Sequence, residues 1–206
     1  MSRGRLITLE GGEGAGKSTN AHFIKSWLEA RGREVVLTRE PGGSPLAEAI
    51  RAVVLREWSE GLPGVTEVLL MFAARAAHLN HTILPALAAD KDVVCDRFVD
   101  SSYAYQSAGK GFPQAQVAQL EQMVMPGFQP ALTLIFDLDP TLGLQRTQQR
   151  GEQNRFEAES LAYMQRVRNL FLSRAQAAPQ RYAVLDAART LDAVQSDLKK
   201  ILEQRL

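Results

Sequence analysis

The stretch that decides the fold is Leu6-Ile7-Thr8-Leu9-Glu10-Gly11-Gly12-Glu13-Gly14-Ala15-Gly16-Lys17-Ser18. It begins with a short apolar run, which predicts a strand, and its second part matches the pattern G-x-x-x-x-G-K-[ST]. In this pattern the glycines let consecutive backbone N–H groups turn inward around a phosphate, and the lysine brings a positive charge to the β- and γ-phosphates. The helix that follows adds the positive end of its dipole. The sequence therefore predicts a nucleoside triphosphate site at the first strand-to-helix turn.

The residues that we expect to contact the triphosphate form one continuous run. They are Gly11, Gly12, Glu13, Gly14, Ala15, Gly16, Lys17, Ser18 and Thr19. Lys17 is a candidate catalytic charge, and the hydroxyl of Ser18 is a candidate Mg²⁺ ligand. The alternative is a glycine-rich connector without a ligand, but a chance match to this pattern is expected in roughly one in a hundred chains of this length.

Four further apolar runs resemble the first. They are Val35–Thr38, Val93–Asp96, Leu132–Asp137 and Tyr182–Asp186. Because these runs are continuous rather than alternating, they predict strands buried on both faces, as in a parallel sheet covered by helices. Helices are expected between them, at Ser18–Arg31, after Ser44-Pro45, after Asp139-Pro140, over Glu157–Gln176 and over Leu191–Leu206. The alternation predicts an α/β fold of the P-loop NTPase type, a single domain over 1–206 with a five-stranded parallel sheet flanked by helices in three layers.

Composition and charge exclude several other classes of protein. Of 206 residues, 45% are apolar and 23% charged, which excludes a disordered tail, a coiled coil or a collagen-like repeat. The net charge of +1 lacks the basic excess of a typical nucleic-acid binder, so no nucleic acid is expected as a partner. No run approaches the roughly 18 apolar residues of a membrane span. The single cysteine, Cys95, and the polar start at Met1–Arg5 predict a cytoplasmic location.

One polar segment, at about residues 143–157, is expected to form a mobile lid. It carries Arg146, Arg150 and Arg155, with Gly151 near its centre. The alternative for each arginine is a solvated helix face.

The chain resembles the thymidylate kinase family over nearly its whole length. The resemblance rests on separated motifs: Leu9–Thr19, Thr38–Gly43, Met71–Arg75, Cys95–Phe98 with Ser102–Gln106, and the arginine-bearing lid. It implies transfer of the γ-phosphoryl group of ATP to dTMP, with Mg²⁺, by a cytoplasmic homodimer. Two other functions remain as alternatives: a kinase for another nucleoside monophosphate, and a nucleotide-dependent switch. A guanine-nucleotide switch commonly carries an N-K-x-D motif, which this chain lacks.

The resemblance also implies which residues hold the acceptor. Arg97 and Arg51 are expected on the dTMP phosphate, and Arg75 on the thymine ring, with Phe72 stacked against that ring. From the residues alone, plain core packing is the preferred interpretation of Phe72, and only the resemblance favours stacking on the base. Arg97 has independent support, because it follows the end of a strand, where ligands gather in open α/β sheets.

Further acceptor contacts are implied just beyond Arg97 and inside the phosphate loop. Ser102 and Gln106 are expected to line the thymine site, and Tyr105 to pack against the deoxyribose. The alternative is a solvated turn. Glu13 is unexpected in a loop that binds phosphates, and the resemblance places it on the 3′-OH of the acceptor sugar.

The expected mechanism depends on cations. Asp96 ends a strand close to the phosphate loop and is the preferred Mg²⁺ ligand over Asp137 and Asp139. The acceptor phosphate, with a second pKa near about 6, is largely dianionic at neutral pH and needs no general base. Catalysis must instead offset repulsion between two anions. The expected cations are Mg²⁺, Lys17, Arg97 and one lid arginine among Arg150, Arg146 and Arg155. A lid arginine is expected because the phosphate loop itself has no arginine, and Arg150 is the first choice because it lies beside Gly151.

Overall fold

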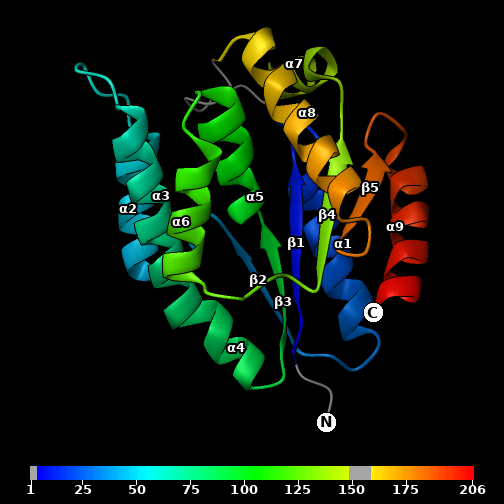
Figure 1. The fold of residues 1–206 in the computed structure, drawn as a ribbon. Coiled ribbons are helices and arrows are strands. Elements are labelled where there is room, and N and C mark those ends of the chain that lie inside the picture. The colour runs from blue at the N-terminus through cyan, green and yellow to red at the C-terminus, as the bar shows by residue number, and fades with distance from the viewer. Residues whose placement is uncertain (1–3, 149–158) are drawn as a thin grey trace.

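The structure is a computed structural model, and it describes residues 4–148 and 159–206. Its centre is one five-stranded parallel sheet with the order β2-β3-β1-β4-β5 (Figure 1). The strands are β1 (Leu6–Gly11), β2 (Val35–Arg39), β3 (Asp92–Asp96), β4 (Leu132–Asp137) and β5 (Tyr182–Asp186). All five predicted strands are confirmed, and so is the α/β fold.

The strand order places β1 in the middle of the sheet, between β3 and β4. Leu9 lies opposite Asp96 of β3 and opposite Leu134 of β4. Because the strands are parallel, their carboxyl ends lie together, at the upper edge in Figure 1. The chain leaves β1 there between its two neighbours, which is the position where open α/β sheets form a ligand crevice.

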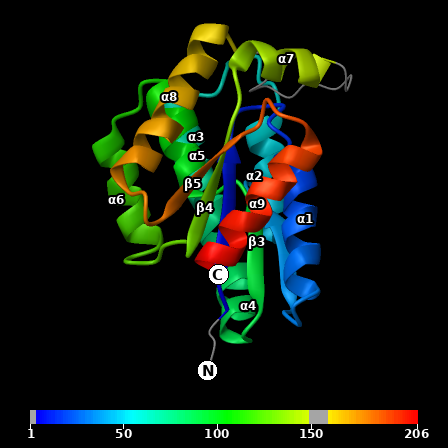
Figure 2. The ribbon, with the colours of Figure 1, turned by 90° about the vertical axis from the view of Figure 1, so that its right-hand side faces the viewer.

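Helices cover both faces of the sheet, as Figure 2 shows. One face carries α1 (Lys17–Glu29) and α9 (Leu191–Arg205), which share a core with Ile7 and Leu9 of β1. The opposite face carries α3 (Gly64–His78), α4 (Leu84–Ala88), α5 (Val99–Ser101), α6 (Gln114–Val124) and α8 (Leu161–Ala177). Helix α2 (Pro45–Leu55) packs on α3, and α7 (Pro140–Gln148) follows β4 above the sheet edge. Two π-helical segments are η1 (Leu79–Ile83) and η2 (Ser102–Gly109).

The predicted helix starts depend on their capping residues. Ser44 caps α2 by accepting from the backbone N–H of Ala47, as the Ser44-Pro45 pair predicts. The predicted start of α8 at Glu157 is wrong, because Glu159 and Ser160 are not helical and Ser160 caps a helix that begins at Leu161. The apolar residues Leu161, Met164, Val167 and Phe171, spaced along one helix face, predict this helix but do not fix its first residue.

Two features bear on the remaining sequence predictions. Within the described residues, no helix has the length and apolarity that a membrane crossing needs. Arg150 and Arg155 lie outside the described residues, whereas Arg146 belongs to α7.

Candidate active site

The phosphate loop joins β1 to α1 and holds its lysine against the loop backbone. Lys17 is buried, and its Nζ donates to the carbonyl oxygens of Gly12 at 2.7 Å and Gly11 at 3.2 Å. Burial lowers the pKa of Lys17, the positive charge of Arg97 lowers it further, and the carboxylate of Glu13 opposes both. The ammonium group is therefore held in place beside the loop before any phosphate binds.

A cleft of about 290 Å³ opens over this loop. Its lining comes from the loop, the start of α1, the end of β3 and α7: Glu13, Gly14, Ala15, Gly16, Lys17, Ser18, Thr19, Asp96, Arg97 and Arg146. Seven of these ten residues belong to the run predicted to contact the triphosphate, so the cleft has the expected position for a nucleotide tail.

The phosphate loop and the start of α7 touch backbone to backbone. Gly14 has φ +72°, and a Cβ atom built on it would lie 2.5 Å from the carbonyl oxygen of Gly143. A Cβ atom on Gly143 would in turn lie 2.5 Å from the carbonyl oxygen of Glu13. Neither position has room for a side chain unless the loop and the helix move apart.

Ser18 and Asp96 form the group best suited to a divalent cation. The Ser18 hydroxyl donates to Oδ2 of Asp96 at 2.7 Å, and both side chains border the cleft over the loop. Hydroxyl and carboxylate oxygens are the ligands that Mg²⁺ prefers, together with water and phosphate oxygens. The alternatives are engaged elsewhere: Asp137 pairs with Arg168 at 2.6 Å, and Asp139 accepts from the N–H of Thr141. The residues present therefore fit the predicted Mg²⁺ site.

Arg97 connects the loop with the neighbouring cleft. It lies directly after β3 with φ +71°, in the left-handed region that non-glycine residues rarely adopt. Its guanidinium group pairs with Oε1 of Glu13 at 2.6 Å and donates to the carbonyl oxygen of Gly11 at 3.1 Å. It also lies over the ring of Tyr105, 4.7 Å from the centroid. The loop carboxylate thus turns toward Arg97.

A second cleft, of about 270 Å³, lies beside the first. The two share Glu13, Ser18, Asp96 and Arg97, and the second is further lined by Arg39, Glu40, Pro41, Arg51, Leu55, Met71, Ser101, Tyr105 and Gln106. Arg51 reaches it from α2 and donates to the carbonyl oxygen of Pro41 at 2.7 Å. Each cleft is bordered by several basic groups, of which Arg97 is common to the two, so each cleft can receive an anion.

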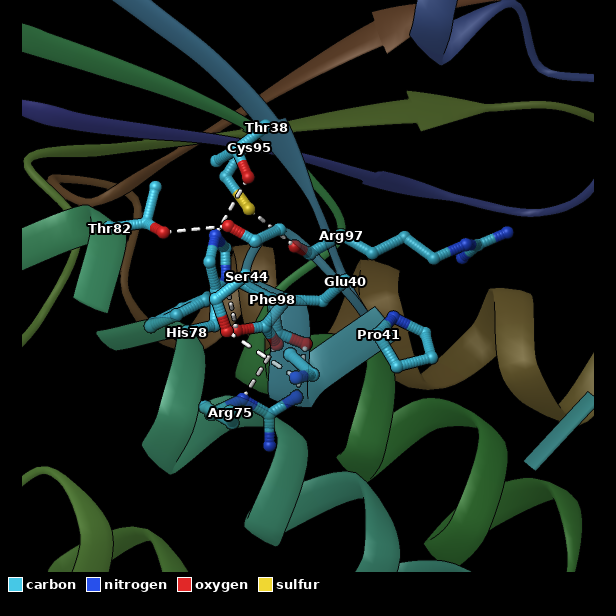
Figure 3. Close-up of polar contacts among 12 residues, drawn as sticks. Thr38, Glu40, Pro41, Ser44, Arg75, His78, Thr82, Cys95, Arg97 and Phe98 are labelled. Atoms are coloured by element: carbon cyan, nitrogen blue, oxygen red, sulfur yellow. Dashed lines mark hydrogen bonds and ion pairs between the residues drawn. The ribbon is translucent and has the colours of Figure 1, made fainter. Parts of the chain in front are cut away.

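A buried charge network supports the second cleft (Figure 3). Arg75 donates from Nε to Oε2 of Glu40 at 2.8 Å, and from Nη1 to the hydroxyl of Ser102 at 3.1 Å. Oε1 of Glu40 lies 3.1 Å from Nδ1 of His78. The side chains of Arg75, Glu40 and His78 are almost wholly inaccessible to solvent. Sequence reasoning selected Arg75 and Ser102 but missed the Glu40 and His78 partners.

Phe72 lies in the core. It is 2% exposed, packs with the apolar residues between the sheet and α3, and does not line the second cleft, whereas its neighbour Met71 does. The guanidinium group of Arg75 lies over its ring, 4.7 Å from the centroid. Phe72 is thus a core residue, as the residues alone predict, and its stacking on thymine stays a prediction.

Ser102, Tyr105 and Gln106 belong to the buried helical segment η2, so the alternative of a solvated turn is wrong. The hydroxyl of Tyr105 donates to Oε1 of Glu13 at 3.2 Å. Burial raises the pKa of Tyr105 well above its usual value, so this hydroxyl keeps its proton. Tyr105 and Gln106 both line the second cleft.

Glu10 is a residue that the sequence analysis missed. It is fully buried at the end of β1 and accepts from the N–H groups of Phe98 at 2.8 Å and Ser101 at 3.2 Å. The Ser101 hydroxyl donates to it at 2.6 Å. Burial, together with the negative charge of Asp100, raises the pKa of Glu10 to about 8, although these donors favour the ionised form. A carboxylate inside an otherwise apolar strand was the available signal.

Arg146 is the lid arginine that the structure describes. Its Nη1 donates to the carbonyl oxygen of Ala187 at 2.9 Å and lies 3.5 Å from that of Gly14. Arg146 therefore borders the phosphate-loop cleft.

A glycine loop with its lysine, a Ser–Asp pair suited to Mg²⁺ and an adjoining cleft with arginines define a phosphate-loop kinase. Comparison with known proteins narrows this class. The family model described as thymidylate kinase matches residues 9–198, and the chain belongs to that family.

Individual relatives agree with this assignment. The chain is 52% identical to a thymidylate kinase of Pseudomonas putida strain GB-1 over 199 residues, which are 97% of this chain and 95% of that protein. It is 52% identical to the thymidylate kinase of Chromohalobacter salexigens over 208 residues, 100% of this chain and 98% of the relative. Among solved structures, the thymidylate kinase of Ehrlichia chaffeensis superimposes with a TM-score of 0.80 at 32% identity, over 98% of this chain and 99% of that one.

Proposed function

We propose that this kinase transfers the γ-phosphoryl group of ATP to dTMP, giving dTDP and ADP, at the junction of its two clefts. The observation that carries the proposal is the wall that the clefts share. Glu13, Ser18, Asp96 and Arg97 border both. A triphosphate held by the loop and a monophosphate held in the second cleft would therefore meet at that wall.

The triphosphate side binds through backbone and charge. The N–H groups of the loop surround the phosphates, and Lys17 leaves its carbonyl partners to contact the β- and γ-phosphates. Ser18 and Asp96 would hold Mg²⁺, directly or through water. When bound, Mg²⁺ would neutralise part of the charge of the phosphates.

The acceptor side divides among phosphate, base and sugar. Arg97 and Arg51 are proposed to hold the phosphate, because both guanidinium groups border the cleft and suit bidentate contact. Arg75, Ser102 and Gln106 are proposed at the thymine base, with Phe72 beside it. Tyr105 and Glu13, hydrogen-bonded to each other, are proposed at the deoxyribose.

The chemistry needs charge more than proton transfer. The acceptor phosphate is already a nucleophile at neutral pH, and the transition state spreads negative charge over the transferring oxygens. Lys17 and Arg97 offset that charge from two sides. We propose that one of Arg146, Arg150 and Arg155 supplies the remaining cation. Removal of the residue that acts in this way should slow turnover by about 10³-fold or more. Near-normal turnover by all three alanine variants would contradict the proposal.

A homodimer in the cytoplasm is the proposed state of the molecule. Exposed apolar side chains on α2 and α3 support a dimer, since Val53 is 40%, Val65 53% and Leu69 52% exposed on two helices that pack together. Sedimentation of the wild-type protein and of a Leu69→Glu variant tests this. A wild-type monomer, or a dimer that the variant leaves intact, would contradict the assignment of this face.

The decisive experiment for the activity is an acceptor panel with ATP and Mg²⁺. We expect ADP formation to depend on dTMP and to be far slower with AMP, GMP or CMP. Preference for another monophosphate would favour a different kinase of the same fold. Tight GTP binding without acceptor-dependent ADP formation would favour a switch protein.

A further inference from the structure

The amide of Gln106 has one satisfied end and one unsatisfied end. Its Nε2 donates to Oε1 of Glu67 at 2.9 Å. Its Oε1 is buried and has no hydrogen-bond partner among the described residues. The side chain is 1% exposed and borders the acceptor cleft. A buried acceptor without a partner is unfavourable, so a ligand that brings a donor would stabilise this part of the cleft wall.

Glu67 fixes the orientation of the Gln106 amide. It lies on α3 with no solvent exposure, and Nζ of Lys110 pairs with its Oε2 at 2.9 Å. A carboxylate accepts hydrogen bonds and donates none, whereas an amide can present either end. The nitrogen of Gln106 must therefore face Glu67, and the carbonyl oxygen is left for the ligand. The chemistry of the pair fixes this orientation.

We propose that Glu67 is a specificity-determining residue, which sets the amide of Gln106 so that the acceptor base meets a hydrogen-bond acceptor. The inference rests on the proposed function, in which Gln106 lies at the base. The Watson–Crick edge of thymine carries one hydrogen-bond donor, the imino N3–H. Cytosine carries an acceptor at the same ring position, so two acceptors would face each other without a proton between them. Rejection of cytosine then comes from a repulsive contact as well as from a lost bond.

The Lys110–Glu67 pair makes the Glu67→Gln variant informative. Lys110 only donates, so the oxygen of the new amide at position 67 should face Lys110 and its nitrogen should face Gln106. Gln106 must then turn, accept from that nitrogen and present its own NH₂ group to the base. The variant is expected to reverse the hydrogen-bonding polarity of the site at nearly unchanged volume.

The test compares dTMP with 5-methyl-dCMP, which keeps the methyl group and the sugar and changes only the Watson–Crick edge. We expect Glu67→Gln to lower kcat/KM for dTMP and raise it for 5-methyl-dCMP, so that their ratio falls at least ~10-fold, because one hydrogen bond of about 1.4 kcal/mol is worth tenfold. Part of the discrimination should persist, since a guanidinium group only donates, and Arg75, proposed at the base, would favour the O4 acceptor of thymine over the 4-amino group of 5-methylcytosine. Lys110→Met in the Glu67→Gln background removes the donor that orients the new amide, and should weaken the change.

Thr133→Val is the matched control for loss of a buried polar contact. It removes one partner of the Thr8–Thr133 hydrogen bond of 2.9 Å in the sheet, away from the cleft, and should leave the ratio unchanged. An unchanged ratio in Glu67→Gln, with wild-type turnover of dTMP intact, would overturn the role of Glu67 alone. Failure of the wild type to phosphorylate dTMP would overturn the proposed function instead.

A second measurement does not depend on the variant folding. In a crystal structure of the wild type with dTMP, Gln106 should lie within hydrogen-bond distance of N3 while keeping its contact with Glu67. A base that approaches elsewhere, or a Gln106 that leaves Glu67 on binding, would overturn the proposal.

Discussion

The two clefts of this kinase are built differently, although they share a wall. The phosphate-loop cleft is formed mainly by backbone groups, and the carbonyl oxygens of two successive residues of one turn hold Lys17. The second cleft is supported by side chains instead. Buried charged groups from distant parts of the chain form ion pairs there, as Arg75 and Glu40 do. The first needs little beyond its own turn, whereas the second depends on the packing of several helices.

This difference separates the expected effects of substitution. A change in the backbone-built cleft should alter catalysis and leave the fold intact. A change in the buried network should alter both, because it leaves a charge in the core without its partner. Four substitutions test the distinction.

Arg75→Leu should have the largest effect on stability. It leaves Glu40 buried without its guanidinium partner, and breaking a buried ion pair in this way costs about 3–5 kcal/mol. Urea denaturation monitored by circular dichroism measures the change. Arg51→Leu, which removes a guanidinium group at the rim of the same cleft, is the control and should change stability by less than ~1 kcal/mol. Equal stability of the two variants would show that the network does not support the fold.

Lys17→Met should affect catalysis instead. Loss of one charge aimed at the transferring phosphoryl group is expected to lower kcat by about 10²–10³-fold. The unfolding free energy should stay within ~1 kcal/mol of wild type, because the partners of Lys17 are loop carbonyl groups beside an open cleft. Steady-state kinetics with dTMP and the same urea titration give both values. A large loss of stability would mean that the two clefts are not built differently.

Asp96→Asn should raise the Mg²⁺ concentration needed for half-maximal rate by about 10–100-fold. The amide keeps the shape of the carboxylate and can still accept from Ser18, but it loses the charge that attracts the cation. A Mg²⁺ titration of turnover at fixed ATP measures this shift. Asp137→Asn, at the end of β4, is the control, and a similar shift there would contradict the assignment of the metal site to Asp96.

Glu10→Gln should change the pH dependence of stability. The pKa of Glu10 is raised from 4.5 to about 8 in the fold, so between these values the folded state keeps a proton that the unfolded state has lost. The unfolding free energy should therefore fall as pH rises, with a slope of up to about 1.4 kcal/mol per pH unit from this group. Urea titrations between pH 5 and about 8 should give a flatter profile for the variant than for wild type. Parallel profiles would show that Glu10 is ionised throughout.

The lining of the phosphate-loop cleft could be predicted from the sequence because its information is local. The strand, the glycines, Lys17 and the following helix are contiguous, and Asp96 could be placed from the end of its strand. The parallel sheet followed from continuous apolar runs that need partners on both faces.

The supports of the acceptor side could not be predicted in the same way. The partners of Arg75 are Glu40, 35 positions away, and Ser102, 27 positions away. Gln106 and Glu67 are 39 positions apart. Nothing in the local pattern states that these side chains meet, because their contacts are set by how α3 packs against η2 and β2. The residues proposed to contact the acceptor could be selected by family resemblance, but the buried partners that hold them in place could not.

The contact between Gly14 and Gly143 limits which positions of the chain can carry the proposed remaining cation. With no space for even a methyl group at position 14, an arginine there would push α7 off the turn. Ala15 is 3% exposed in the core, so a long side chain at that position would displace the packing beneath it. Positions 14 and 15 therefore have no room for an arginine side chain. The proposed remaining cation is therefore expected from α7 or from the chain that follows it rather than from position 14 or 15.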